Sequence, residues 1–252
     1  MATKELNSND VRGDDSNEVE MSFLDHLEEL RWRIIYALIG IVVGTVICWI
    51  FINYLINVVL LKPAHDAGAT LQNLKPFGQI FLYFEVAFIG GIILSIPNIF
   101  YQFWKFIAPA LRKNERKYIL AIVFYSTFCF LAGIVFAYFS LLPYTMKFAA
   151  QFGTSQIKNE FAINEYLSIV IGIMLGAGII FELPMVSYFL TRLGILTPAF
   201  MKKYRKYAII VIFIIAAFLT PPDPVSQVML AVPLVLLYEI SIFISKLALK
   251  KR

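Results

Sequence analysis

Six long apolar runs divide this 252-residue chain and limit the folds that it can adopt. They cover residues 34–61, 77–103, 118–142, 166–190, 207–219 and 225–244. A helix of about 20 apolar residues crosses the hydrocarbon core of a bilayer, and all the runs except the fifth reach that length. Hydrophobic residues make up 60% of the chain, against roughly 45 to 50% in soluble proteins. The sequence therefore predicts an all-α, multi-pass membrane protein with six transmembrane helices.

The basic residues gather in alternate connections between these runs. The N-terminal entry, the second loop, the fourth loop and the C-terminus together hold sixteen Lys and Arg residues, and the first, third and fifth loops hold four. Cytoplasmic loops carry the excess of Lys and Arg, so both termini are predicted to be cytoplasmic. The formal net charge of +5 has the same origin, and binding to nucleic acid is not expected.

The second loop, WKFIAPALRKNERK over residues 104–117, combines a cluster of cations with a single acid. The acid is Glu115, and the cations are Lys105, Arg112, Lys113, Arg116 and Lys117. A loop that only orients a helical hairpin needs the cations and not the acid. Glu115 is therefore a candidate for binding a cationic partner.

The chain before the first run divides into two parts. Residues 1–20 are polar and acidic, and they are predicted to form a disordered tail without the apolar segment of a secretory signal. Over residues 21–33, apolar side chains recur at helical spacing, with acids and bases on the other face. This pattern predicts an amphipathic helix at the membrane interface, within a single domain over residues 21–250.

Proline residues mark the expected ends of several runs. The first run is expected to end at Lys62 and Pro63 and the third at Pro143, because proline cannot continue a helix. The fifth run, 207–219, covers about 20 Å, short of a hydrocarbon core of about 30 Å. The proline-rich turn that follows it, which includes Asp223, is therefore predicted to lie below the outer membrane surface.

Glu182 lies in the fourth run, ten residues before Arg192 and close to the bilayer midplane. A carboxylate at that depth is costly unless it is protonated, paired or hydrated, so it should face protein or water and not lipid. Acids inside membranes mark functional sites by default, and the alternative is a neutral glutamic acid bonded to a neighbouring helix. Pro184, two residues later, predicts a kink in the span.

Glu29 and Glu115 are both predicted at the cytoplasmic face. Each has basic neighbours along the chain, and taken alone each fits a surface ion pair that contributes at most about 1 kcal/mol. Two carboxylates on one rim could instead bind two guanidinium groups, because arginine pairs with a carboxylate through two parallel hydrogen bonds that lysine cannot reproduce. The spacing alone does not choose between these interpretations.

The sequence offers no pattern typical of a metal site. Cys48 and Cys129 lie inside apolar runs without a Cys-x-x-Cys or Cys/His spacing, which indicates buried hydrophobic residues. His26 and His65 are far apart and belong to no cluster of ligands. We expect neither a metal nor a cofactor.

Three motifs carry a resemblance to a known family. They are HLEELRWR over residues 26–33, YQFWKFIAPAL over 101–111 with Pro97 before it and Glu115 after it, and LTPPD over 219–223 followed by Ser226 and Gln227. In the order and spacing of these motifs the chain resembles the TatC family of the twin-arginine protein translocase, over essentially residues 21–250. The second motif is not a generic apolar pattern, which makes the resemblance specific.

The resemblance implies a concave, glove-like bundle of six transmembrane helices in the bacterial cytoplasmic (inner) membrane. Such a protein is expected to be a receptor for the twin-arginine signal peptides of folded cargo. It is expected to work with single-span TatA and TatB subunits, membrane lipids and further copies of itself, driven by the proton-motive force.

The resemblance also implies a signal-peptide site. Glu29 and Glu115 match the acids implicated in recognising the arginine pair, and Phe106 lies in the same recognition loop. Arg31 matches a position that is sensitive for activity, and we include it in this site. Glu28 is a departure from the family, which often has an apolar or basic residue beside the recognising acid.

Further residues match positions implied in translocation or partner binding. Glu182 matches an acid inside the concave face that is thought to meet a polar residue of a partner helix. Asp223 and Gln227 match the outer hairpin and the start of the last helix, where TatA and TatB dock. Pro63 and Pro97 match positions that are sensitive for activity.

Two other functional classes fit parts of the sequence. A proton-coupled secondary transporter could use Glu182 as a proton relay, but it should contain internal repeats, and no repeat is apparent. An intramembrane protease needs paired aspartates, a Ser/His pair or an HExxH motif within the spans. Asp223 is the only aspartate after Asp66, and no HExxH motif occurs. The leading interpretation is therefore a receptor and translocase core that is not an enzyme.

Overall fold

The computed structural model describes residues 23–108, 119–153, 159–220 and 223–250. Almost all of them are helical, in the order α1 (Phe23–Ile50), α2 (Ile52–Tyr54), the π-helix η1 (Leu55–Leu60), α3 (Lys62–Asp66), β1 (Thr70–Gln72), α4 (Gly78–Ile107), α6 (Ile119–Phe136), the π-helix η3 (Ala137–Leu141), α7 (Leu142–Gln151), β2 (Glu160–Ala162), α8 (Ile163–Phe181), α9 (Leu183–Leu193), α10 (Pro198–Lys203), α11 (Arg205–Leu219) and α12 (Pro224–Lys250). The tail predicted over residues 1–20 and most of the second loop lie outside the described residues.

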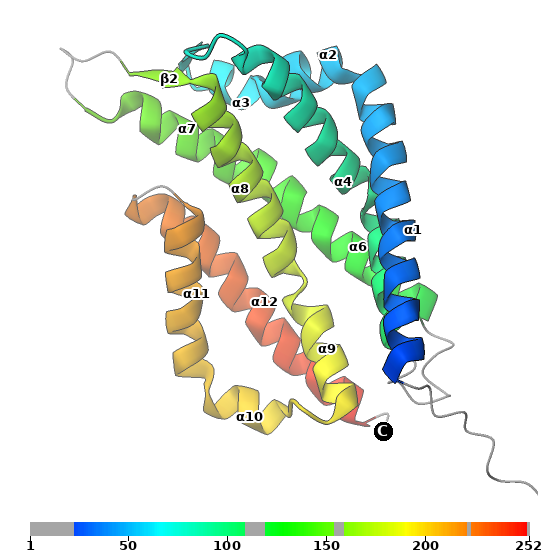
Figure 1. Cartoon of the computed structure of the whole chain (residues 1–252). Coiled ribbons are helices and arrows are strands. Elements are labelled where there is room, and N and C mark those ends of the chain that lie inside the picture. Colours follow the sequence, from blue (N-terminus) through cyan, green and yellow to red (C-terminus); the bar gives the residue numbers. More distant parts are fainter. Residues whose placement is uncertain (1–22, 109–118, 154–158, 221–222, 251–252) are drawn as a thin grey trace, which may run out of the picture.

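The helices form an open bundle with two distinct ends (Figure 1). The start of α1, the end of α4, the end of α9, α10 and the end of α12 lie together at the bottom of Figure 1. We call this the terminal end. At the top, α2 and α3 cross the bundle beside β2, and we call this the cap end.

Five helical stretches among the described residues are long and apolar enough to cross a membrane. They are Asp25–Ile50, Gly78–Ile107, Ile119–Gln151, Ile163–Leu193 and Pro224–Leu249. The remaining long helix, α11, has 15 residues, which corresponds to about 22 Å. The structure thus confirms an all-α, multi-pass membrane protein, with a fifth helix as short as the sequence predicts.

Helices α1 and α4 pack along one another because glycines let their backbones approach closely. A Cβ atom on Gly44 would lie 2.6 Å from the carbonyl oxygen of Gly91, and one on Gly91 would lie 2.5 Å from the backbone nitrogen of Thr45. At the same interface the hydroxyl of Ser95 donates to the carbonyl of Gly40 over 2.6 Å. Small residues are the usual means of close helix contact in membranes.

The predicted first span, 34–61, is wrong at its far end, because α1 stops at Ile50. The chain then turns, and α2 and η1 cross the bundle at the cap end. The side chains that this segment buries recur at every fourth position: Ile52, Ile56 and Leu60. An apolar run can therefore continue past a span when its last turns pack on other helices.

The amphipathic helix predicted over residues 21–33 is not separate from the first span. Helix α1 runs through its described part into the span without a break. No glycine or proline occurs between Phe23 and Tyr36, so no local signal ends the helix there.

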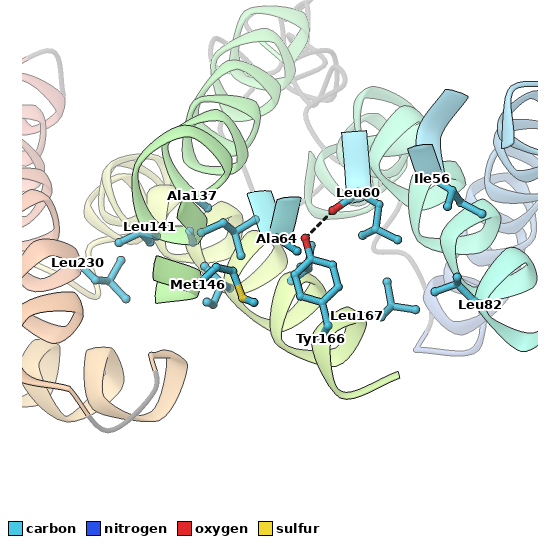
Figure 2. Packing of buried hydrophobic residues seen from close by; sticks show 14 of the residues in the cluster. Ile56, Leu60, Ala64, Leu82, Ala137, Leu141, Met146, Tyr166, Leu167 and Leu230 are labelled. Carbon is cyan, nitrogen blue, oxygen red and sulfur yellow. Dashed lines mark hydrogen bonds between the residues drawn. The ribbon is translucent and has the colours of Figure 1, made fainter. Parts of the chain in front are cut away.

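Pro63 leaves a backbone carbonyl at the cap end without its usual helical donor. It lies in the first turn of α3 and has no N–H for the carbonyl of Val59, four residues earlier. The hydroxyl of Tyr138 donates to that carbonyl over 2.9 Å. The hydroxyl of Tyr166 donates to the next carbonyl, that of Leu60, over 2.5 Å (Figure 2). Tyrosines from η3 and α8 thus bind the segment that follows α1.

The buried core near the cap end is centred on α8. Figure 2 shows Tyr166 and Leu167 of α8 among side chains from other elements, including Met146 of α7, Leu82 of α4 and Leu230 of α12. Strands β1 and β2 add a short parallel ladder, in which Thr70 pairs with Glu160. These contacts connect the first and third loops, which the sequence did not predict to pair.

Pro143, predicted to end the third run, lies inside the continuous stretch Ile119–Gln151. It occupies the first turn of α7, where a backbone N–H is not needed. The five residues before α7 form η3, so the helix changes its hydrogen-bond register just before the proline. The predicted end at Pro143 is therefore wrong.

The other proline effects agree with the sequence. The fourth run divides at Glu182 into α8 and α9, with Pro184 in the first turn of α9. The end of α11 and the start of α12 lie below the level of α3 and β2 in Figure 1. This position agrees with a hairpin too short to reach the cap end.

Candidate functional site

Glu29 lies near the start of α1 at the terminal end, and its carboxylate is only half paired. Its Oε1 accepts from Arg33, one helical turn later on α1, with Nη2 at 2.8 Å and Nε at 3.3 Å. The two side chains are 19% and 17% exposed. The second oxygen, Oε2, is buried and has no hydrogen-bond partner among the described residues. A buried carboxylate oxygen without a donor is costly, and a ligand that supplies a donor would remove that cost.

Arg33 also bonds to α4 and so connects Glu29 with that helix. Its Nη1 donates to Oε1 of Gln102 over 3.3 Å, and Nε2 of Gln102 donates to Oδ1 of Asn98 over 3.4 Å. The amide of Asn98 in turn donates to the carbonyl of Tyr36 on α1 over 3.1 Å. This row of bonds fixes the position of α1 against α4 beside Glu29.

An aromatic contact lies next to Glu29. The ring of His26 stacks on Phe106, with centroids 4.4 Å apart and planes 16° apart. Phe106, near the end of α4, is thereby placed beside the first turn of α1. Glu115, the second acid predicted for this site, lies outside the described residues.

The other predicted residues of the signal-peptide and activity sites are scattered. Arg31 and Glu28 are exposed on α1, whereas Glu29 is partly buried and bonds to Arg33, the residue that contacts α4. Pro97 is exposed within α4. Pro63 is buried at the cap end, away from the terminal end.

Glu182 is buried at the break between α8 and α9, with 9% of its surface exposed. Its carboxylate interacts with Ser126 and the backbone of Phe130 on α6, and Cys129 lies near it. Ser126 also accepts from Nε1 of Trp104 over 3.2 Å. Oε1 of Glu182 has no partner among the described residues. The acid therefore faces a neighbouring helix and not lipid.

Asp223 and Gln227 shape the hairpin of α11 and α12. Asp223 is 2% exposed, and its Oδ2 accepts from the backbone N–H of Ser226 over 2.6 Å, which caps α12. The amide of Gln227 donates to the carbonyl of Phe213 on α11 over 3.1 Å. Gln227 also lines an apolar cavity of about 370 Å³ on α11. Both residues lie apart from Glu29.

Sequence reasoning missed the residues that hold Glu29 in place. It placed Arg31 in the signal-peptide site, and it gave no role there to Arg33, Gln102 or Asn98. Their spacing was a usable signal, because residues 98 and 102 are one helical turn apart and so share a face of the second run. Within the described ranges, no three His, Cys, Asp or Glu side chains come close enough to hold a metal ion.

These features define a class of protein. Long apolar helices cross a membrane, and carboxylate oxygens without a hydrogen-bond partner among the described residues lie on Glu29 at one end of the bundle and on two buried acids, Glu182 and Asp223. This is a multi-pass membrane protein suited to binding partners. The chain belongs to the TatC family, since the family model described as Sec-independent protein translocase protein (TatC) matches residues 25–233.

Curated relatives cover nearly the whole chain. Sec-independent protein translocase protein TatC of Carboxydothermus hydrogenoformans is 40% identical over 227 residues, which are 90% of this chain and 93% of that protein. The protein of the same name from Helicobacter pylori is 40% identical over 222 residues, or 88% of each chain. TatCy of Bacillus subtilis is 39% identical over 233 residues, which are 92% and 91% of the two chains.

Solved structures agree with the fold. A crystal structure of the twin-arginine translocase receptor TatC matches with a TM-score of 0.73 and 37% identity, over 88% of this chain and 99% of that one. A second, of the same receptor in DDM, matches with a TM-score of 0.75 and 36% identity, over 86% and 98%. The protein is thus a component of a protein translocase and not an enzyme, which decides against the transporter and protease alternatives.

Proposed function

We propose that this protein is the receptor and core subunit of a twin-arginine translocase, and that it binds twin-arginine signal peptides at the terminal end. The observation that carries this proposal is the half-paired carboxylate of Glu29. Arg33 holds one oxygen in place, and the other is buried without a donor among the described residues. A guanidinium group of the signal peptide would supply that donor.

The surroundings of Glu29 favour an arginine ligand over a lysine ligand. A planar guanidinium can bond to Oε2 and stack against an aromatic ring at the same time, and an ammonium group cannot. Phe106, which stacks on His26, offers such a ring nearby. We assign the second arginine of the signal peptide to Glu115, and we place Arg31 on the rim of the site.

The protein is proposed to lie in the bacterial inner membrane with its terminal end in the cytoplasm. The uneven distribution of Lys and Arg supports this orientation, because cytoplasmic loops carry the excess. Signal peptides of folded cargo would then meet the site on the side where they are made. The proton-motive force would drive the export that follows.

Single-span TatA and TatB subunits are proposed to dock on α11. The cavity of about 370 Å³ on this helix has mostly apolar walls, and Gln227 is its polar residue. A partner helix could fill the apolar part and bond to Gln227, while Asp223 fixes the start of α12. Glu182 would meet a polar residue of a partner helix during translocation, and several copies of the chain would assemble in the complex.

A crosslinking experiment tests the signal-peptide site. A twin-arginine peptide with a photoreactive residue beside the arginine pair is added to membranes that contain the full chain or the Glu29→Ala, Glu115→Ala double variant. We expect crosslinking to the wild type and its loss in the double variant. The Glu28→Ala variant is the matched control and should behave like the wild type. Unchanged crosslinking in a correctly inserted double variant would overturn the proposal.

A further inference from the structure

His26 and Phe106 form a pair of stacked rings where the first turn of α1 meets the last turn of α4 at the terminal end (Figure 1). Their centroids are 4.4 Å apart, and their planes are nearly parallel, at 16°. Both residues are partly exposed, so the fold does not enclose either ring. The pair therefore offers an accessible aromatic surface at this end of the bundle.

The stacked rings lie beside the free oxygen of Glu29. His26 precedes Glu29 by three residues, and side chains at that spacing are neighbours on one face of a helix, with Cβ atoms about 5 to 6 Å apart. Oε1 of Glu29 accepts from Arg33, and Oε2 has no partner among the described residues. A ligand group that bonds to Oε2 would therefore lie within reach of the rings.

The cations on the two helices point elsewhere. Lys105, the neighbour of Phe106, lies over the ring of Tyr101, with Nζ at 5.3 Å from the centroid. Arg33 directs its guanidinium group to Glu29 and Gln102. Within the described ranges, no cation–π contact involves Phe106. The aromatic surface is thus open to a cation that comes from a ligand.

We propose that His26 is a specificity-determining residue of the signal-peptide site, because its ring holds Phe106 in place as a flat surface for the guanidinium group of a peptide arginine. This inference rests on the proposed function and adds the residue that makes the site prefer arginine to lysine. A guanidinium group is planar and weakly hydrated, so it stacks on a ring while its N–H groups bond to Oε2 of Glu29. An ammonium group binds a carboxylate as a point charge and gains less from a flat surface. Loss of the imidazole would leave the ring of Phe106 without its stacking partner and free to rotate.

Two signal peptides separate this role from a structural one. They are identical except that the recognised pair is Arg-Arg in one and Lys-Lys in the other, and each is titrated against the full chain in detergent. The test variant is His26→Leu, which keeps an apolar side chain of similar size without a flat ring. His26→Gln takes its place if the first variant does not fold. His26→Phe restores a ring, and His65→Leu is the matched control, since His65 is exposed at the cap end.

We expect the wild type and the His65→Leu variant to prefer the Arg-Arg peptide. In His26→Leu, the affinity for the Arg-Arg peptide should fall about fivefold while that for the Lys-Lys peptide stays unchanged, because a cation on a partly exposed ring contributes modestly to binding. His26→Phe should keep the preference. An unchanged preference in His26→Leu, an equal loss for both peptides, or a loss of preference in His26→Phe would overturn the role of His26 and leave the proposed function intact. A wild-type chain without any preference for the Arg-Arg peptide would overturn the proposed function as well.

Discussion

The two ends of the bundle are held by different kinds of bonds. At the cap end, the hydroxyls of Tyr138 and Tyr166 donate to backbone carbonyls in largely buried surroundings. At the terminal end, Arg33 bonds to Glu29 and Gln102 through partly exposed polar groups. One oxygen of Glu29 is left without a donor there among the described residues, whereas the carbonyls of Val59 and Leu60 at the cap end each accept from a tyrosine.

Because of this difference, the bonds at the cap end should matter for stability, and the carboxylate at the terminal end should matter for binding. A carbonyl bonded to a buried tyrosine has no route to a ligand, so its bond can only stabilise the fold. The spare oxygen of Glu29 is buried too, but it belongs to a partly exposed side chain, so a ligand that displaces its cover can bind it without breaking the contact with Arg33. We therefore expect substitutions at the cap end to change the free energy of unfolding, and substitutions at Glu29 to change peptide binding.

The largest effect is expected for Glu29→Gln. The glutamine keeps an oxygen for Arg33 but removes the charge that a guanidinium ligand needs. Loss of one partner of a desolvated charge pair costs about 2 to 5 kcal/mol, so the affinity for a twin-arginine peptide should fall by about 30-fold or more. Peptide titration followed by fluorescence anisotropy measures this affinity. Glu28→Gln, which changes an exposed neighbour, should have no effect, and equal losses in the two variants would contradict the distinction between the two acids.

Gly91→Ala tests whether the two ends depend on the same contact between α1 and α4. Its Cβ would lie 2.5 Å from the nitrogen and 2.7 Å from the Cα of Thr45, so the backbones must move apart. We expect a loss of about 1 to 3 kcal/mol in the free energy of unfolding, together with weaker peptide binding. Gly172→Ala is the control, because no heavy atom lies within 4 Å of its Cβ. A loss of stability with normal peptide binding would show that the terminal end is independent of helix spacing.

Sequence alone predicted the parts of the fold that hydropathy and proline determine. The second run, 77–103, corresponds to α4 within four residues, and the short fifth run corresponds to α11. The break at Glu182 follows from the backbone N–H that Pro184 lacks. These features depend on local properties of the chain, which a sequence displays directly.

The errors have one physical cause, which is tertiary context. Residues 52–60 are as apolar as a span, and only their packing on α4 shows that they turn aside. Pro143 is tolerated because the π-helix before it changes the hydrogen-bond register. Likewise, Glu29 was recognisable as a candidate, but the bond between its partner Arg33 and Gln102 depends on how α1 is rotated against α4.

Tyr166→Phe removes a donor at the cap end without changing the shape of the core. The carbonyl of Leu60 would remain buried without its partner, which costs about 1 to 3 kcal/mol. Thermal unfolding in detergent should occur at a lower temperature, and peptide affinity should stay within error of the wild type. Tyr125→Phe is the control, since Tyr125 is 58% exposed. A Tyr166 variant of normal stability but weak peptide binding would reverse the roles that we assign to the two ends.

The smallest effect is expected for Gln102→Ala, which removes a single link of the terminal end. The variant loses the bonds of Gln102 to Arg33 and Asn98, but Arg33 keeps Glu29 and Asn98 keeps the carbonyl of Tyr36. One or two partly exposed hydrogen bonds contribute about 1 kcal/mol. We therefore expect a small fall in the unfolding temperature and a loss of peptide affinity of about threefold, because Arg33 holds Glu29 less firmly. Gln79→Ala, at the exposed start of α4, should change neither quantity. If Gln102→Ala abolished peptide binding altogether, Gln102 would have to contact the peptide itself, and the terminal end would be a wider site than the carboxylate of Glu29.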